Sequence, residues 1–206
     1  MDSYFGYIEQ IDDGGWLTIK FDDGLIWSLP EYTQVHVKSS NGRETFEVLE
    51  GRFFGKKASV KKKGWRWDQW DIDRSYFEEE VHLKEGCIHT DAAQLRFYKK
   101  SKILEVTGLG SFKAMTDPKN PIPDGTYDIE LPYKPHKSSF RYEARANYYR
   151  TWFRVGNSGD RFLHCGNISA GCLTVTDIDK WDAIYKHLII SRNDFNSIGT
   201  VKVLNL

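Results

Sequence analysis

The chain has little of what holds together a disulfide-rich or membrane-spanning protein. Its 206 residues include only three cysteines and six prolines, and no run of apolar residues is long enough for a transmembrane helix. An odd number of cysteines does not build a disulfide framework. The first residues also lack the basic and apolar regions of a secretory signal. We therefore expect a protein that is made in the cytoplasm without a signal peptide and has no membrane span.

Neither sign of charge dominates, since 29 basic residues balance 29 acidic ones. The chain shows no nucleic-acid-binding motif, internal repeat or low-complexity segment, so no nucleic acid is predicted as a partner. Nothing in the sequence implies a cofactor. A zinc site from Cys87, His89, His164 and Cys172 is a minor alternative, because no paired Cys-x2-Cys spacing supports it. No metal is therefore predicted.

What the chain does have is a series of short apolar runs separated by turn signals. Between Tyr4 and Gly51 these runs are punctuated by Asp13-Gly14-Gly15, Asp22-Asp23-Gly24 and Asn41-Gly42. Such spacing is typical of hairpins in a small barrel or sandwich. The stretch Lys84-Glu85-Gly86 resembles a joint, so we predict an accessory β-rich domain over residues 1–84 and a second domain over 85–206.

The second domain is also predicted to be mainly β, with one helix. Strands are expected around Cys87–Thr90, Leu95–Tyr98, Ile103–Val106, Gly125–Leu131, Arg161–His164 and Gly199–Leu204, and a loop is expected over 108–124. Asp177 is a good N-cap, and Ile178, Trp181, Ile184, Tyr185 and Leu188 recur at helical spacing. We predict a helix over 177–190 beside a β-sandwich.

The most informative segment runs from Phe162 to Val175 and places a histidine and two cysteines among glycines. A thiol becomes a strong nucleophile when an imidazole or a helix N-terminus lowers its pKa, and both are expected near Cys172. The amides of Gly171 and Cys172 lie in a glycine turn that can face a developing oxyanion. By itself this spacing is a weak signal, since most free cysteines are inert core residues, and Cys165 is interpreted as one of these.

Several segments resemble the L,D-transpeptidase catalytic domain (the YkuD-like fold). Ser169-Ala-Gly-Cys-Leu is similar to the nucleophile motif Ser-His-Gly-Cys-Ile/Leu of that family, and His164 stands where the family has its base. Pro123-Asp-Gly-Thr-Tyr-Asp-Ile and Gly199-Thr-Val-Lys-Val resemble two further landmarks, in the right order. The resemblance covers about residues 86–206 and implies an L,D-transpeptidase-like β-sandwich with Cys172, His164, Gly171 and Ser169 as catalytic residues.

The segment also departs from the family pattern. The histidine that precedes Gly-Cys in the family is Ala170 here, and the arginine two residues after the cysteine is Thr174. A basic aromatic stretch before the motif occupies the region that often forms a lid in the family. It contributes Tyr149, Arg150, Trp152 and Arg154, which with Asn167 are the expected substrate-binding residues.

The resemblance implies attack by Cys172 on the bond between an L-centre and a D-centre of a peptidoglycan stem peptide. Water, a D-amino acid and a second stem all remain as acceptors. The short interval from His164 to Cys172 resembles compact toxins delivered by type VI secretion, which implies an antibacterial effector acting in the periplasm, with a cognate immunity protein and a secretion apparatus as partners. The alternatives are a catalytically inactive wall-binding module and a housekeeping L,D-transpeptidase.

Overall fold

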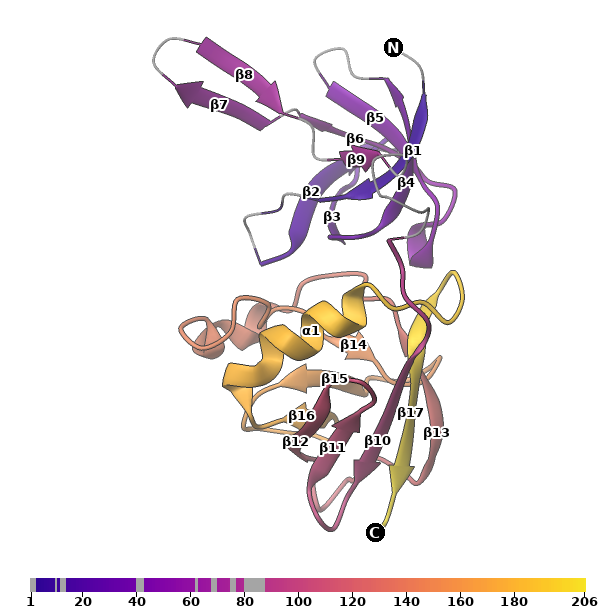
Figure 1. Cartoon of the computed structure of the whole chain (residues 1–206), viewed down its shortest axis with the longest axis vertical. Coiled ribbons are helices and arrows are strands. Elements are labelled where there is room, and N and C mark those ends of the chain that lie inside the picture. The colour runs from indigo at the N-terminus through magenta and orange to yellow at the C-terminus, as the bar shows by residue number, and fades with distance from the viewer. Residues whose placement is uncertain are drawn as a thin grey trace. The chain divides into compact units, whose positions relative to one another are not determined.

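A computed structural model describes residues 3–9, 11, 14–39, 43–61, 63–67, 70–74, 77–79 and 88–206. The chain divides into two compact units, Met1–Ile88 and His89–Leu206, each built on its own β-sheet (Figure 1). The prediction of a mainly β protein with one helix in its second half is confirmed. The expected joint around Lys84 and Cys87 lies outside the described residues.

The first unit is a seven-stranded sheet in the order β3-β2-β6-β5-β4-β1-β9, with a separate hairpin. Its elements are β1 (Tyr4–Ile8), β2 (Trp16–Phe21), β3 (Ile26–Pro30), β4 (Gln34–Ser39), β5 (Arg43–Val48), η1 (Gly51–Phe53), β6 (Lys57–Lys61) and β9 (Phe77–Glu79), while β7 (Lys63–Trp67) pairs with β8 (Trp70–Arg74). Along β2, Leu17, Ile19 and Phe21 are buried while Thr18 and Lys20 are exposed. This alternation directs one face into the unit's apolar core.

The second unit is an eight-stranded sheet in the order β13-β17-β10-β11-β12-β16-β15-β14. Its strands are β10 (Ala93–Tyr98), β11 (Ile103–Val106), β12 (Gly110–Met115), β13 (Gly125–Glu130), β14 (Phe153–Arg154), β15 (Phe162–Cys165), β16 (Leu173–Val175) and β17 (Ser197–Leu204). A bridge between Ile129 and Val155 joins the two outer strands. The predicted sandwich therefore takes the form of one sheet that curves until its edges meet.

Two local predictions for this unit are wrong. The segment 108–124 was expected to be a loop, but its first half forms β12, where Phe112 and Ala114 point into the core. The expected strand around Thr90 is reduced to an isolated bridge between Thr90 and Ser191. In the first case the glycines of the segment occupy the turn before the strand and its first residue, where positive φ is needed.

The helix begins later than predicted. A 3-10 turn, η4 (Ile178–Lys180), precedes α1 (Trp181–Ile189), and the carboxylate of Asp177 accepts a hydrogen bond from the Lys113 N–H at 2.7 Å instead of capping the helix. The expected apolar face of the helix is buried. Phe153 of β14 contacts both Trp181 and Tyr185, so α1 packs on the β14 edge of the sheet (Figure 1).

Candidate active site

A seven-residue loop connects two adjacent parallel strands and carries most of the expected site residues. β15 and β16 pair in parallel, with His164 opposite Thr174, and only residues 166–172 lie between the two strands. Parallel neighbours usually need a connection of a dozen or more residues. We call residues 166–172 the crossover loop. It leaves the end of β15 with Asn167, passes Ser169 and brings Gly171 and Cys172 to the start of β16, beside the strand that carries His164.

Side-chain hydrogen bonds hold the crossover loop in this tight path. The Tyr142 hydroxyl donates to Asn167 Oδ1 at 2.6 Å, and the Asn120 amide donates to the Ala170 carbonyl at 3.4 Å. Within the loop, Ser169 Oγ donates to the Cys172 carbonyl at 2.8 Å. Ser169 therefore shapes the turn that presents Cys172.

Arg161 fixes the peptide that precedes Cys172. Its Nη1 donates to the Gly171 carbonyl at 2.5 Å, and its Nη2 donates to Asn120 Oδ1 at 3.0 Å. Gly171 has φ +105°, and a Cβ added there would lie 2.8 Å from Arg161 Nη1 and from the Asn120 carbonyl. Only glycine fits this backbone and this space. Arg161 and Asn120 thus orient the peptide whose amides were expected to face an oxyanion.

The Cys172 thiol is buried near the start of β15. Its Sγ lies 3.9 Å from the Asp160 carbonyl. Burial raises the pKa of Cys172, against smaller opposite effects from the Phe162 N–H and Arg161. The expected help from a helix N-terminus is absent, because β16 and η4 separate Cys172 from the first residue of α1. Cys172 is therefore a neutral thiol at neutral pH.

Hydrogen bonds engage both ring nitrogens of His164. Nδ1 lies 2.8 Å from the Cys165 carbonyl, which can only accept, so Nδ1 carries the proton. Nε2 lies 3.1 Å from Thr174 Oγ1 and accepts from that hydroxyl. Burial lowers the pKa of His164 to about 4. The imidazole is therefore neutral at pH 7, with its basic nitrogen on the side of β16.

Cys172 is the last residue before β16, next to the strand that carries His164. The register sets His164 opposite Thr174, so Cys172 precedes the partner of His164 by two residues in the sequence. Among the described residues, no hydrogen bond joins Sγ to the imidazole, and Nε2 is bonded to Thr174 instead. The imidazole must therefore leave Thr174 before Nε2 can accept the thiol proton.

His164 is the first of three stacked rings, followed by Trp152 and His136. Trp152 stacks on His164 with centroids 4.1 Å apart, and His136 stacks on the other face of Trp152 at 4.2 Å. Burial, with smaller effects from Lys134 and His164, lowers the pKa of His136 to about 4. Trp152 thus lies directly against the expected base and shields it from solvent.

The other expected substrate-binding residues differ in how far they are exposed and in how many contacts they make within the protein. Arg154 lies over the Tyr133 ring, donates to its hydroxyl at 3.0 Å and lies 3.9 Å from Glu130, with only 17% of its side chain exposed. It is held mainly by the protein. Tyr149 and Arg150 are half-buried in the turn before β14, and the Arg150 carbonyl accepts from the His136 N–H. Asn167 is exposed.

Sequence reasoning did not select Arg161, Asn120, Tyr142 or His136 for the site. Arg161 lies three residues before His164, but its role depends on the parallel register, which sets it across from Gly171. Asn120 comes from a distant loop. Cys165 is buried, and burial raises its pKa to about 12, as suits an inert core thiol. Cys87 lies outside the described residues.

No protein-family model and no curated protein matches the chain. Solved structures of L,D-transpeptidases do match it. L,D-transpeptidase 1 of Mycobacterium tuberculosis is 15% identical, with 83% of this chain and 89% of that chain covered and a TM-score of 0.41. L,D-transpeptidase 3 of the same organism, in complex with a faropenem-derived adduct, is 12% identical, with 92% and 77% covered and a TM-score of 0.36. At these identities and TM-scores, an activity has to be argued from the site residues themselves.

Proposed function

We propose that residues 85–206 catalyse acyl transfer from a peptide carbonyl through a thioester on Cys172. The observation that carries this proposal is a buried thiol at the start of β16 and a neutral imidazole on the adjacent strand β15, with Nδ1 bonded to a carbonyl so that Nε2 remains the basic nitrogen. A nucleophile, a base and a group that orients the base are what this chemistry requires. Residues 1–84 are proposed as an accessory domain.

In the proposed reaction, Cys172 Sγ attacks the carbonyl carbon while the thiol proton passes to His164 Nε2. The tetrahedral oxyanion is stabilised by N–H groups of the turn at Gly171, whose peptide is oriented by Arg161. Collapse breaks the C–N bond, and His164 returns the proton to the leaving amine. The acyl group then passes from sulfur to an acceptor, which is water in a carboxypeptidase and an amine in a transpeptidase.

The proposed substrate is the stem peptide of peptidoglycan, cut between an L-centre and a D-centre. The support is the similarity of Ser169-Ala-Gly-Cys-Leu to the L,D-transpeptidase motif, with His164 upstream. Neither the raised pKa of Cys172 nor the engagement of His164 by Thr174 matches a resting thiolate–imidazolium pair. We therefore propose that substrate binding activates the pair by moving His164 from Thr174 towards Cys172.

The experiment is incubation of the purified full chain with a disaccharide tetrapeptide, with and without a free D-amino acid. Loss of the terminal residue, exchange of it or formation of a dimer is expected by mass spectrometry. Cys172→Ala is expected to abolish every product. Cys165→Ala is the matched control, because it removes a buried thiol but keeps the carbonyl that holds His164. Binding of the muropeptide without any mass change would instead support the wall-binding alternative.

We further propose that the protein acts as an antibacterial effector on the wall of a target cell. The support is the short interval between His164 and Cys172, which resembles that of compact secreted toxins. Expression of the chain fused to a periplasmic signal is expected to arrest growth, whereas cytoplasmic expression is not. Arrest that persists with Cys172→Ala would contradict this role. A cognate immunity protein is expected to relieve the arrest.

A further inference from the structure

A pocket of about 330 Å³ opens beside the crossover loop, on the side where Ser169 lies. The turn from β10 to β11 supplies three of its lining residues, Lys99, Lys100 and Lys102. Met115 and Asp117 also line the pocket, and Ser169 is hydrogen-bonded to the Cys172 carbonyl. A ligand in this pocket would therefore lie next to the segment that presents the nucleophile.

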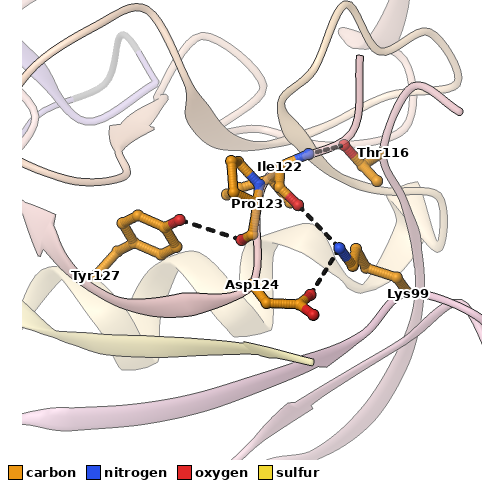
Figure 2. A network of polar contacts seen from close by, with 6 residues as sticks. All are labelled: Lys99, Thr116, Ile122, Pro123, Asp124 and Tyr127. Carbon is orange, nitrogen blue, oxygen red and sulfur yellow. Dashed lines mark hydrogen bonds and ion pairs between the residues drawn. The ribbon is translucent and has the colours of Figure 1, made fainter. Parts of the chain in front are cut away.

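Lys99 is part of the pocket wall rather than a free charge. Its ammonium forms an ion pair with Asp124 at 2.6 Å and donates to the Ile122 carbonyl at 3.3 Å. Figure 2 shows this network, in which the Ile122 N–H also donates to Thr116 Oγ1 and the Tyr127 hydroxyl donates to the Pro123 carbonyl. These hydrogen bonds and the ion pair fasten the loop 116–124 to the end of β10 and neutralise Lys99.

Lys100 and Lys102 are different. Both are exposed, and neither forms an ion pair with any residue that the structure describes. Asp117 is the acidic side chain among those that line the pocket, so the lysines of the lining outnumber its carboxylate side chains. Two exposed ammonium groups beside partly apolar walls suit an organic anion.

Lys102 is also held in an unfavourable backbone conformation. It has φ 58°, in the left-handed region, while its carbonyl accepts from the Ala114 N–H at 2.8 Å. Glycine or asparagine adopts this conformation at lower cost. A long cationic side chain at a position that favours glycine points to a use for the charge.

We propose that the pocket binds a carboxylate of the peptide substrate through Lys100 and Lys102, and so selects stems with free carboxylates over stems in which these groups are carboxamides. This inference rests on the proposed function, since the pocket borders the turn of Cys172. A carboxamide cannot form the charge-assisted hydrogen bonds that a carboxylate forms with ammonium groups. For each such hydrogen bond, the expected preference for the free-acid stem is about tenfold in affinity.

The test compares a free-acid tetrapeptide with the same peptide carrying carboxamides at its second and third residues. Binding to the full chain with Cys172→Ser is measured by calorimetry, and turnover by the native chain is measured by mass spectrometry. The variants are Lys100→Ala and Lys102→Asn, alone and together. Lys202→Ala is the matched control, because Lys202 is an exposed lysine of β17 that does not line the pocket.

The native pocket is expected to favour the free-acid peptide, and the double variant is expected to bind both peptides equally. Lys102→Asn is also expected to raise the melting temperature while it weakens binding, which a merely structural lysine would not do. Equal binding of both peptides by the native pocket, or a preference that survives the double variant, would overturn the proposal. Selective binding of the free-acid peptide without turnover would contradict the proposed acyl transfer but support the proposed carboxylate site. The failure of one proposal can therefore be distinguished from the failure of the other.

Discussion

The indole of Trp152 lies parallel to the imidazole of His164, with ring centroids 4.1 Å apart and planes inclined by 15°. This stacking buries the ring that is expected to act as the base. It explains why burial is the main cause of the low pKa of His164. Solvent access to the proposed base is therefore limited by a residue of the segment just before β14.

Removal of the indole is expected to raise the pKa of His164. In Trp152→Ala, solvent reaches the imidazole, so its pKa should move from about 4 towards the ordinary 6.5. A pH titration of the His164 ring signals by NMR measures this shift. Trp27→Ala, which removes an indole from the first unit, is the control and should leave His164 unchanged. A His164 pKa that stays near 4 in Trp152→Ala would show that other residues exclude solvent from the imidazole.

Loss of the Thr174 hydroxyl is expected to release His164 Nε2. Thr174→Val leaves a buried acceptor without its donor, so we expect a loss of about 1–2 kcal/mol of folding free energy. The freed nitrogen can then accept the thiol proton, and alkylation of Cys172 at neutral pH should become several-fold faster. Mass spectrometry of the labelled peptide gives the rate. A slower rate would mean instead that Thr174 helps to hold the imidazole in its reactive position.

Alanine substitutions at Gly171 and Gly159 form a matched pair, because both glycines have a positive φ. Gly159 has φ +81° with nothing within 4 Å of an added Cβ, so Gly159→Ala measures backbone strain alone. Gly171→Ala adds a steric conflict with Arg161 and Asn120. We expect it to lower the free energy of unfolding by roughly 1–3 kcal/mol more than Gly159→Ala does, and to abolish product formation. Chemical denaturation and the muropeptide assay check both effects, and equal costs for the two variants would count against the role of Arg161.

Stability is expected to fall on acidification below pH 6.5. The unfolded chain protonates His164 near pH 6.5, whereas the folded chain resists protonation until about pH 4. The folded state therefore loses free energy relative to the unfolded state between these pH values, by roughly 3 kcal/mol for one histidine with such a shift. His136 acts in the same direction. Chemical denaturation at several pH values gives the free energy of unfolding as a function of pH. This free energy should change less with pH in His164→Gln than in the native chain, and the same pH dependence in both would contradict the buried neutral state.

Much of the fold follows from local sequence patterns. Alternating apolar residues mark β2 and β10, and the helical spacing of Trp181, Tyr185 and Leu188 marks the buried face of α1. The start of the helix was misplaced because Asp177 binds the Lys113 N–H of a distant strand, which no local pattern reveals. Tertiary hydrogen bonds decide such boundaries.

The site was predictable only in part for the same reason. His164 and Cys172 stand out because histidine and cysteine flank a glycine-rich segment. Their relative placement depends on the parallel pairing of β15 with β16, and a seven-residue connection gives no hint of a parallel pair. Arg161 and Asn120 meet Gly171 only once that pairing exists. The direction of the Cys172 pKa shift likewise follows from burial in the folded unit.

The crossover loop also ties the proposed activity to contacts between distant parts of the chain. Arg161 lies only 10 residues from Gly171, but Tyr142 and Asn120 lie 25 and 50 residues from the loop residues that they bind, so these two anchors cannot restrain the loop until distant parts of the unit have met. Contacts of such long sequence separation form late and slowly. Partly folded or truncated chains would therefore carry the Cys172 thiol without its environment, and recovery of the proposed activity after dilution from denaturant would lag behind the recovery of β-structure.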